Sequence, residues 1–194
     1  MTVQAPPSTV AEFDAADAGA AAQLLEPCCA SRRWVATVVA GRPYGAPAAL
    51  AAGSDASLHA LAWDDVLEAL AAHPRIGERA TGDGREAAWS RQEQAGAAAD
   101  LAGRAAAGPA DPADPADRAD PADRADPAEQ RREGNLAYEQ RFGYVFLICA
   151  TGLSAGQVLA GLRERLGHDP ESERAVVRAE LAEIVRLRLA KAFR

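Results

Sequence analysis

The sequence lacks the features of several protein classes. No run of 18 apolar residues occurs, so we expect no transmembrane helix and no membrane partner. The first ten residues have neither a basic nor an apolar signal region, so we expect no secretory signal. The three Cys, two of them adjacent (Cys28 and Cys29), form neither a disulfide framework nor a Cys-x-x-Cys metal site. This cysteine usage is typical of the reducing cytoplasm, where we place the chain.

Positive charge and large apolar residues are also scarce. The net charge of −7 argues against nucleic acid as a partner, because phosphates require a basic face. Leu, Ile, Val and Phe together number 35 of the 194 residues, whereas Ala alone numbers 49. So low a share of large apolar residues predicts that part of the chain is disordered.

One segment differs in composition from the rest of the chain. Residues 110–127 repeat the triplet Ala-Asp-Pro or Ala-Asp-Arg six times and contain almost nothing apolar. Frequent Pro forbids a continuing helix, so we predict a disordered linker at about 108–128. An acidic partner-binding tract is the alternative, but an expanded surface loop is the simpler interpretation. We also predict a flexible N-terminus over residues 1–12 and one domain over 13–194.

Most of the remaining chain has helical signals. Residues 57–72 place Trp63, Val66, Leu67 and Leu70 on one face of a helix, which must end before Pro74. Capping patterns and apolar spacing predict further helices over residues 90–107, 129–141, 154–166 and 169–192.

The apolar run 144–150 is ambiguous between a buried strand and a buried helix. Because no partner strand is evident, we favour a helix. The predicted fold is therefore all-α, a single-domain helical bundle with one long disordered acidic loop.

Two polar residues occupy positions where the helical pattern calls for apolar ones. Arg188 falls at the centre of the stripe formed by Val177, Leu181 and Ile184, where a guanidinium is costly unless it is paired. A structural ion pair or a snorkelling side chain is the common explanation, and an anion or carbonyl clamp in a pocket is the other. His73 completes the stripe of its own helix, where a histidine is usually a satisfied core or capping residue. The alternative is a proton-transfer group at an exposed pocket rim.

A third feature is the sequence Ser90-Arg91-Gln92-Glu93-Gln94. Ser90 and Glu93 form a capping box, but the bidentate amide of Gln94 is not needed for capping. If Glu93 faces His73 in the fold, the pair could position a proton. Cys149 lies within an apolar run, where a thiol is normally inert. The histidines have no metal-ligand spacing, so we expect no metal site.

These motifs together resemble the OHCU decarboxylase family, named for 2-oxo-4-hydroxy-4-carboxy-5-ureidoimidazoline (OHCU), an intermediate derived from urate. The resemblance covers roughly residues 13–193 apart from the triplet tract. It rests on Trp34, Arg42-Pro43-Tyr44, His73-Pro74-Arg75-Ile76-Gly77, Ser90-x-x-Glu93-Gln94, Asn135-x-x-Tyr138-x-x-Arg141-Phe142-Gly143-Tyr144-x-Phe146 and Arg188-Leu189.

The resemblance implies an all-α carboxy-lyase without a cofactor that converts OHCU to (S)-allantoin, and a homodimer. It makes His73 the catalytic histidine, and we add Glu93 as the group that orients its ring. The implied substrate-binding residues are Pro74, Ser90, Arg91, Gln92, Glu93, Gln94, Phe146, Leu147, Ile148, Cys149, Ala150 and Arg188.

Two other functions remain open at this point. The chain could be another cofactor-free lyase or hydrolase that acts on a ureide, although such enzymes more often have a metal cluster or a Cys nucleophile with a His base. It could also be a non-catalytic helical adaptor in which the acidic repeat binds the partner and His73 is structural.

Overall fold

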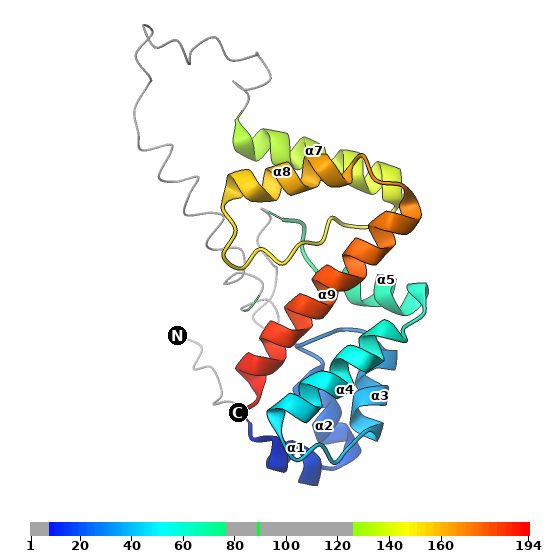
Figure 1. The fold of residues 1–194 in the computed structure, drawn as a ribbon, viewed down its shortest axis with the longest axis vertical. Coiled ribbons are helices and arrows are strands. Elements are labelled where there is room, and N and C mark those ends of the chain that lie inside the picture. Colours follow the sequence, from blue (N-terminus) through cyan, green and yellow to red (C-terminus); the bar gives the residue numbers. More distant parts are fainter. Residues whose placement is uncertain (1–7, 77–88, 90–125) are drawn as a thin grey trace, which may run out of the picture.

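The computed structural model describes residues 8–76, Trp89 and residues 126–194 of the chain. Within these residues the regular structure is helical, apart from one isolated bridge between Ser8 and Phe193. The helices, labelled as in Figure 1, are α1 (Val10–Ala15), α2 (Ala18–Leu25), α3 (Arg32–Ala40), α4 (Pro47–His59), α5 (Trp63–Ala71), α7 (Pro127–Phe142), α8 (Ala155–Arg165) and α9 (Pro170–Ala192). The predicted all-α class is confirmed.

The long C-terminal helix α9 connects the two ends of the molecule (Figure 1). Helices α1 to α5 gather at one end, where α3 contacts α2, α4 and α5, and α4 contacts α9. Helices α7 and α8 lie side by side at the other end. The chain between α7 and α8 is non-helical and runs back beneath these two helices before α8 begins.

The buried apolar residues form two separate clusters. The large core joins α1–α5 to the C-terminal part of α9 and includes Phe13, Leu25, Trp34, Leu50, Leu70, Trp89, Leu181 and Val185. The small core lies between α7, α8 and the connection between them. Its buried members are Ile76, Tyr138, Phe146, Ala150, Val158 and Leu162.

Local capping signals explain most of the helix ends. Ser154 and Gln157 form the predicted capping box at the start of α8, and Asp169 caps α9 with Pro170 in the first turn. Helix α7 ends at Gly143, whose φ of 82° is the left-handed conformation that glycine adopts most easily. Asp126 caps the start of α7, so Pro127 and Ala128, which we predict to be part of the linker, belong to this helix.

Two predicted boundaries differ from the structure. The single helix over residues 57–72 is wrong, because the chain breaks between α4 and α5 at residues 60–62 and Asp65 accepts the Ala62 N–H at the new helix start. The N-terminus is not flexible as far as residue 12. Helix α1 begins at Val10, which is buried, and Ser8 exchanges two main-chain hydrogen bonds with the C-terminus.

The Arg42-Pro43-Tyr44 motif ties the N-terminal helices together. Arg42 Nη1 donates to the carbonyls of Phe13 and Ala16, each at 2.7 Å. The Asp14 carboxylate in turn accepts the main-chain N–H of Tyr44 at 3.0 Å. The motif therefore has a structural role at the α1 end, away from the site described below.

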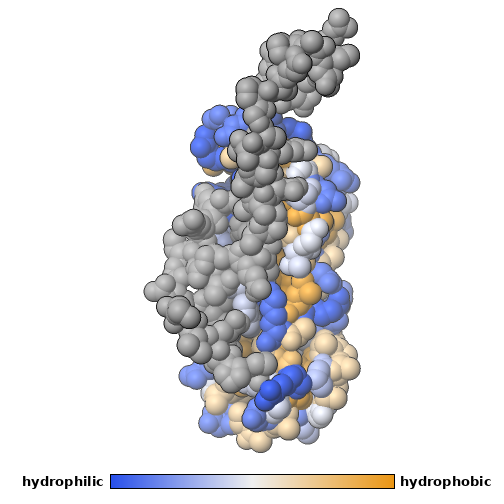
Figure 2. All heavy atoms as spheres, turned by 90° about the vertical axis from the view of Figure 1, so that its left-hand side faces the viewer, coloured by the Kyte–Doolittle hydropathy of each residue, from blue (hydrophilic) through white to orange (hydrophobic). Residues whose placement is uncertain are grey.

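The surface differs between the two ends of the molecule. The α1–α4 end exposes many small apolar residues, whereas hydrophilic residues dominate the α7–α8 end (Figure 2). In the described part of the chain no helix combines the length and the apolar character that are needed to cross a membrane.

Candidate active site

His73 lies directly after α5 and is held by the last turn of that helix. Its main-chain N–H donates to Leu70 O, and its ring Nδ1 lies 2.9 Å from Ala69 O. Because a carbonyl can only accept, Nδ1 carries a proton, and Nε2 is the basic nitrogen of the neutral ring. His73 is 9% exposed, so it is buried, as the interpretation as a core residue predicts, and it does not lie at an exposed rim.

The His73 side chain lines a small cavity together with Arg188 of α9. Arg188 is 1% exposed, which confirms its predicted place on the buried stripe of the helix. The cavity volume is ≈ 30 Å³, and the lining residues are His73, Pro74, Ile76, Phe146, Leu147, Ile148, Cys149, Ala150, Thr151, Ile184 and Arg188. Segments far apart in the sequence therefore bring a histidine and an arginine into one enclosed space.

The segment 145–150 forms one wall of this cavity and is not helical. Its side chains alternate, since Val145, Leu147 and Cys149 pack on the large core and the intervening Phe146, Ile148 and Ala150 pack on the small core. This two-residue period is that of an extended strand. The predicted helix over 144–150 is therefore wrong. We call this segment the site strand.

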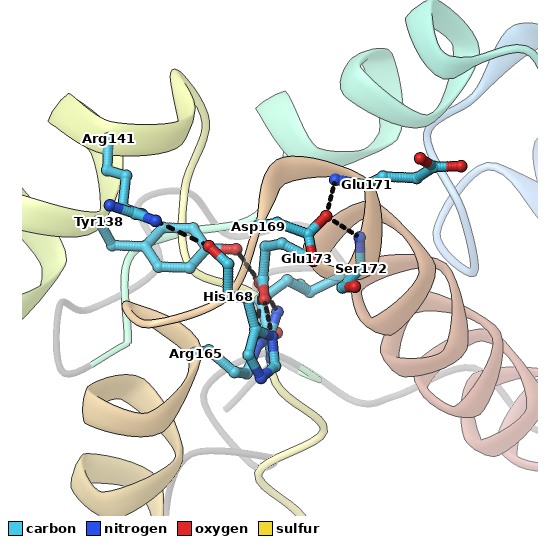
Figure 3. A network of polar contacts seen from close by, with 9 residues as sticks. Tyr138, Arg141, Arg165, His168, Asp169, Glu171, Ser172 and Glu173 are labelled. Atoms are coloured by element: carbon cyan, nitrogen blue, oxygen red, sulfur yellow. Dashed lines mark hydrogen bonds and ion pairs between the residues drawn. The ribbon is translucent and has the colours of Figure 1, made fainter.

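A buried polar network supports the site strand from the side of α8 and α9 (Figure 3). Arg165 Nη1 donates to Leu147 O at 2.7 Å, and its guanidinium lies 4.6 Å from the centre of the Phe146 ring. Arg165 also pairs with Glu173 at 2.6 Å, and both side chains are almost fully buried. A charged pair deep in the protein thus fixes the main chain of the cavity wall.

Tyr138 and His168 complete the network around Glu173. The Tyr138 hydroxyl donates to Glu173, and His168 Nδ1 lies 2.8 Å from the second carboxylate oxygen. Burial raises the pKa of Tyr138, and its hydrogen bond to Glu173 raises it further, so the phenol stays neutral and acts as a donor. Each partner lies on a different element, so no local sequence pattern marks this network.

Two contacts attach the segment that follows His73 to α7. Arg75 forms a bidentate pair with Glu139, with N···O distances of 2.5 and 2.7 Å. Asn135 Nδ2 donates to Ile76 O at 3.0 Å, and Asn135 is buried. Asn135 therefore holds the cavity wall that contains Ile76. Tyr138 supports the other wall, the site strand, through Glu173 and Arg165.

The predicted site residues fall into two groups. The structure brings His73, Pro74, the site strand and Arg188 around one cavity. Ser90, Arg91, Gln92, Glu93 and Gln94 lie outside the described residues, so their place at the site stays a prediction. Among the described residues no three His, Cys, Asp or Glu side chains gather as a candidate metal site.

Comparison with known proteins assigns the family. The sequence model described as OHCU decarboxylase matches residues 14–190, so the chain belongs to the OHCU decarboxylase family. It is 27% identical over 168 residues to the "Uric acid degradation bifunctional protein TTL" of Arabidopsis thaliana, which covers 86% of this chain and 45% of that protein. It is 42% identical over 55 residues to the "2-oxo-4-hydroxy-4-carboxy-5-ureidoimidazoline decarboxylase" of Amia calva, which covers 28% of this chain and 31% of that protein.

The matched region spans less than half the length of these two curated relatives. Solved structures show the same fold. A crystal structure of OHCU decarboxylase in the presence of (S)-allantoin matches with a TM-score of 0.63 at 23% identity, covering 86% of this chain and 94% of that one. A crystal structure of (S)-allantoin synthase matches with a TM-score of 0.63 at 21% identity, covering 97% of this chain and 54% of that one.

Proposed function

We propose that this protein decarboxylates OHCU to (S)-allantoin without a cofactor, as a carboxy-lyase of urate degradation. The observation that carries the proposal is the meeting of His73 and Arg188 in one enclosed cavity of a chain that belongs to the OHCU decarboxylase family. A basic nitrogen and a guanidinium in a buried space suit an anionic ureide substrate.

The chemistry of OHCU explains why a histidine and hydrogen-bond donors suffice. Loss of CO₂ breaks a bond between the carboxylate and a ring carbon, and the electron pair moves into the adjacent imine. The substrate thus carries its own electron sink. The protein has to orient the carboxylate, exclude water and deliver a proton to one face of the ring.

Each site residue has a distinct part in this proposal. His73 Nε2 accepts the proton of the substrate hydroxyl or holds the carboxylate, since Nδ1 is committed to Ala69 O. Arg188 binds a carbonyl or the carboxylate. Glu93 orients the imidazole, Gln94 binds the ureido group, and Pro74, Ser90, Arg91, Gln92 and the site strand line the substrate.

The cavity must widen when substrate binds. Its volume of ≈ 30 Å³ is far below the roughly 300 Å³ at the lower end for small-molecule sites. We therefore expect the side chains around His73 and Arg188 to rearrange, and binding to order them around the ring.

A direct assay tests the proposed function. Urate is oxidised and hydrolysed in situ to OHCU. The decay of OHCU is then followed by ultraviolet absorption and circular dichroism with and without the protein. We expect faster decay, release of one CO₂ per OHCU and a product with the dichroism of (S)-allantoin. Decay at the spontaneous rate, with racemic product, would contradict the proposal and favour the adaptor or another ureide enzyme.

We further propose a cytoplasmic homodimer. The cytoplasmic assignment is supported by the cysteine usage of the sequence, which has three Cys, two of them adjacent, and no disulfide framework. The dimer is proposed from the family resemblance, and analytical ultracentrifugation tests it. A single species with the mass of one chain at micromolar concentration would contradict the dimer.

A further inference from the structure

The two main-chain edges of the site strand are used differently. In an extended chain the N–H and C=O groups of alternate residues point to opposite edges. On one edge, Leu147 O accepts from Arg165 and Cys149 N donates to Glu180 Oε2, each at 2.7 Å. The odd-numbered positions are therefore bound to side chains of α8 and α9.

The other edge of the site strand has no main-chain partner among the described residues. Across the described ranges no hydrogen bond is recorded for the main-chain N–H or C=O of Phe146 or Ile148. Ile148 is only partly buried and lines the cavity that holds His73 and Arg188. A buried or half-buried strand edge without partners is costly unless something binds to it.

One face of helix α9 lies along the site strand and can fix the position of its main chain. Glu180, Ile184 and Arg188 follow one another at intervals of four residues and share one helix face. Four helical residues rise about 6 Å, close to the roughly 6.6 Å spanned by two strand residues. The helix face therefore runs alongside the strand, with Glu180 bonded to Cys149 and with Ile184 and Arg188 at the cavity.

We propose that Glu180 is a positioning residue for the substrate. By holding the Cys149 N–H on the bound edge, it keeps the N–H and C=O of Ile148 turned toward the cavity. There they hydrogen-bond to the C=O and N–H of a cyclic amide or cyclic urea. This inference rests on the proposed function, because the ring of OHCU supplies that pair of groups.

Substitutions of Glu180 test the inference through kinetics. Glu180→Leu removes the acceptor, and we expect kcat/KM to fall about 10-fold or more, mainly through a higher KM. Glu180→Gln keeps an acceptor oxygen, and kcat/KM should stay within about 3-fold of the wild-type value. The matched control is Glu183→Leu on an exposed face of α9, which should change kcat/KM less than 2-fold. An unchanged kcat/KM in folded Glu180→Leu would overturn the inference.

Amide hydrogen exchange gives a readout that does not depend on turnover. In the wild-type protein we expect slow exchange of the Cys149 amide. Exchange should stay slow in Glu180→Gln, which keeps an acceptor oxygen, and become fast in Glu180→Leu, which has none. Addition of (S)-allantoin should slow exchange at Ile148 and leave Cys149 unchanged. Fast exchange at Cys149 in the wild-type protein would overturn the role of Glu180. An inactive wild-type protein with a protected Cys149 amide would instead contradict the proposed function alone.

Discussion

The large core and the small core differ in the kind of side chain that is buried in them. Around Phe13, Trp34 and Leu181 the large core is packed by apolar side chains from α1–α5 and α9. The small core adjoins the buried pair of Arg165 and Glu173, which bonds to the main chain of the site strand. A buried ion pair adds little net stability to a fold. Its hydrogen bonds are directional, however, and they fix the position of a neighbouring main chain. The large core therefore serves as the scaffold, whereas the small core sets the geometry of a cavity wall.

Removal of one partner of the buried pair should have the largest effect on stability. Glu173→Ala leaves the Arg165 guanidinium buried without its carboxylate, and we expect the free energy of unfolding to fall by about 3–5 kcal/mol. Urea unfolding measures the loss. The exposed Glu164→Ala on α8 is the control, with an expected change of less than about 0.5 kcal/mol. If Glu173→Ala lowers the free energy of unfolding by less than about 1 kcal/mol with a normal m-value, the Arg165–Glu173 pair does not support the site strand as described above.

Replacement of both partners sharpens the same comparison. In the double variant Arg165→Met/Glu173→Leu no charge is left buried, so most of the lost stability should return. The main-chain contact to Leu147 O is still lost, so kcat/KM should stay below the wild-type value. Full activity in this double variant would contradict the positioning role of the small core.

Arg188 should behave in the opposite way, with a larger effect on turnover than on stability. Arg188→Leu completes the apolar stripe of Val177, Leu181 and Ile184, so we expect the urea midpoint to hold or rise. Turnover of OHCU should fall about 100-fold, because a charge-assisted hydrogen bond to substrate is lost. A collapsed urea midpoint with normal turnover in the folded fraction would show that Arg188 is structural.

The pair between Arg75 and Glu139 should give a smaller, pH-dependent effect. Its hydrogen bonds lower the pKa of Glu139 below the ordinary value of 4.5. A depressed carboxyl pKa stabilises the fold above the unfolded-state pKa, and that contribution is lost as the pH falls through the folded-state pKa. Because the pair is partly exposed, we expect about 0.5 kcal/mol. Urea unfolding at pH 7 and pH 3.5 measures this difference, and Glu139→Gln should reduce it.

Replacement of the triplet tract should have little effect on either turnover or stability. When residues 110–125 are replaced by a few Gly and Ser, we expect turnover within about a factor of two and a change in unfolding free energy of about 0.6 kcal/mol or less. The deletion must spare Asp126, which caps α7, and Asp126→Ala alone should cost about 1 kcal/mol. Two bridge lengths control for strain. If the proteins with both bridge lengths fold but are inactive, the tract is part of the active site or of an oligomer that activity requires.

Local signals allowed most of the helices to be predicted. The capping box of Ser154 and Gln157, the cap at Asp169 and the stop at Gly143 each act within a few residues, so the sequence alone reveals them. The break at residues 60–62 contains only Ala and Leu, and no Gly or Pro marks it. The site strand was assigned to a helix because both of its faces are buried, which removes the alternation that reveals a half-buried strand.

The candidate site was predictable only in part. Arg188 is detectable because it interrupts an apolar helix stripe, and His73 because it precedes Pro74 at a helix end. The partners Arg165 and Glu173 look like ordinary charged residues of two surface helices. Their burial depends on how α8 and α9 meet the site strand, which is a tertiary property that the helical period does not encode.

Turnover of OHCU by His73→Ala tests the central claim most directly. The side chain is buried, and its Nδ1 is hydrogen-bonded to Ala69 O, so we expect its loss to cost about 1 kcal/mol of stability. The exposed His59→Ala is the matched control and should keep wild-type turnover. The account predicts that folded His73→Ala loses at least about 100-fold in the rate of (S)-allantoin formation, because the proposed proton-transfer group is gone. Wild-type turnover in folded His73→Ala would contradict it.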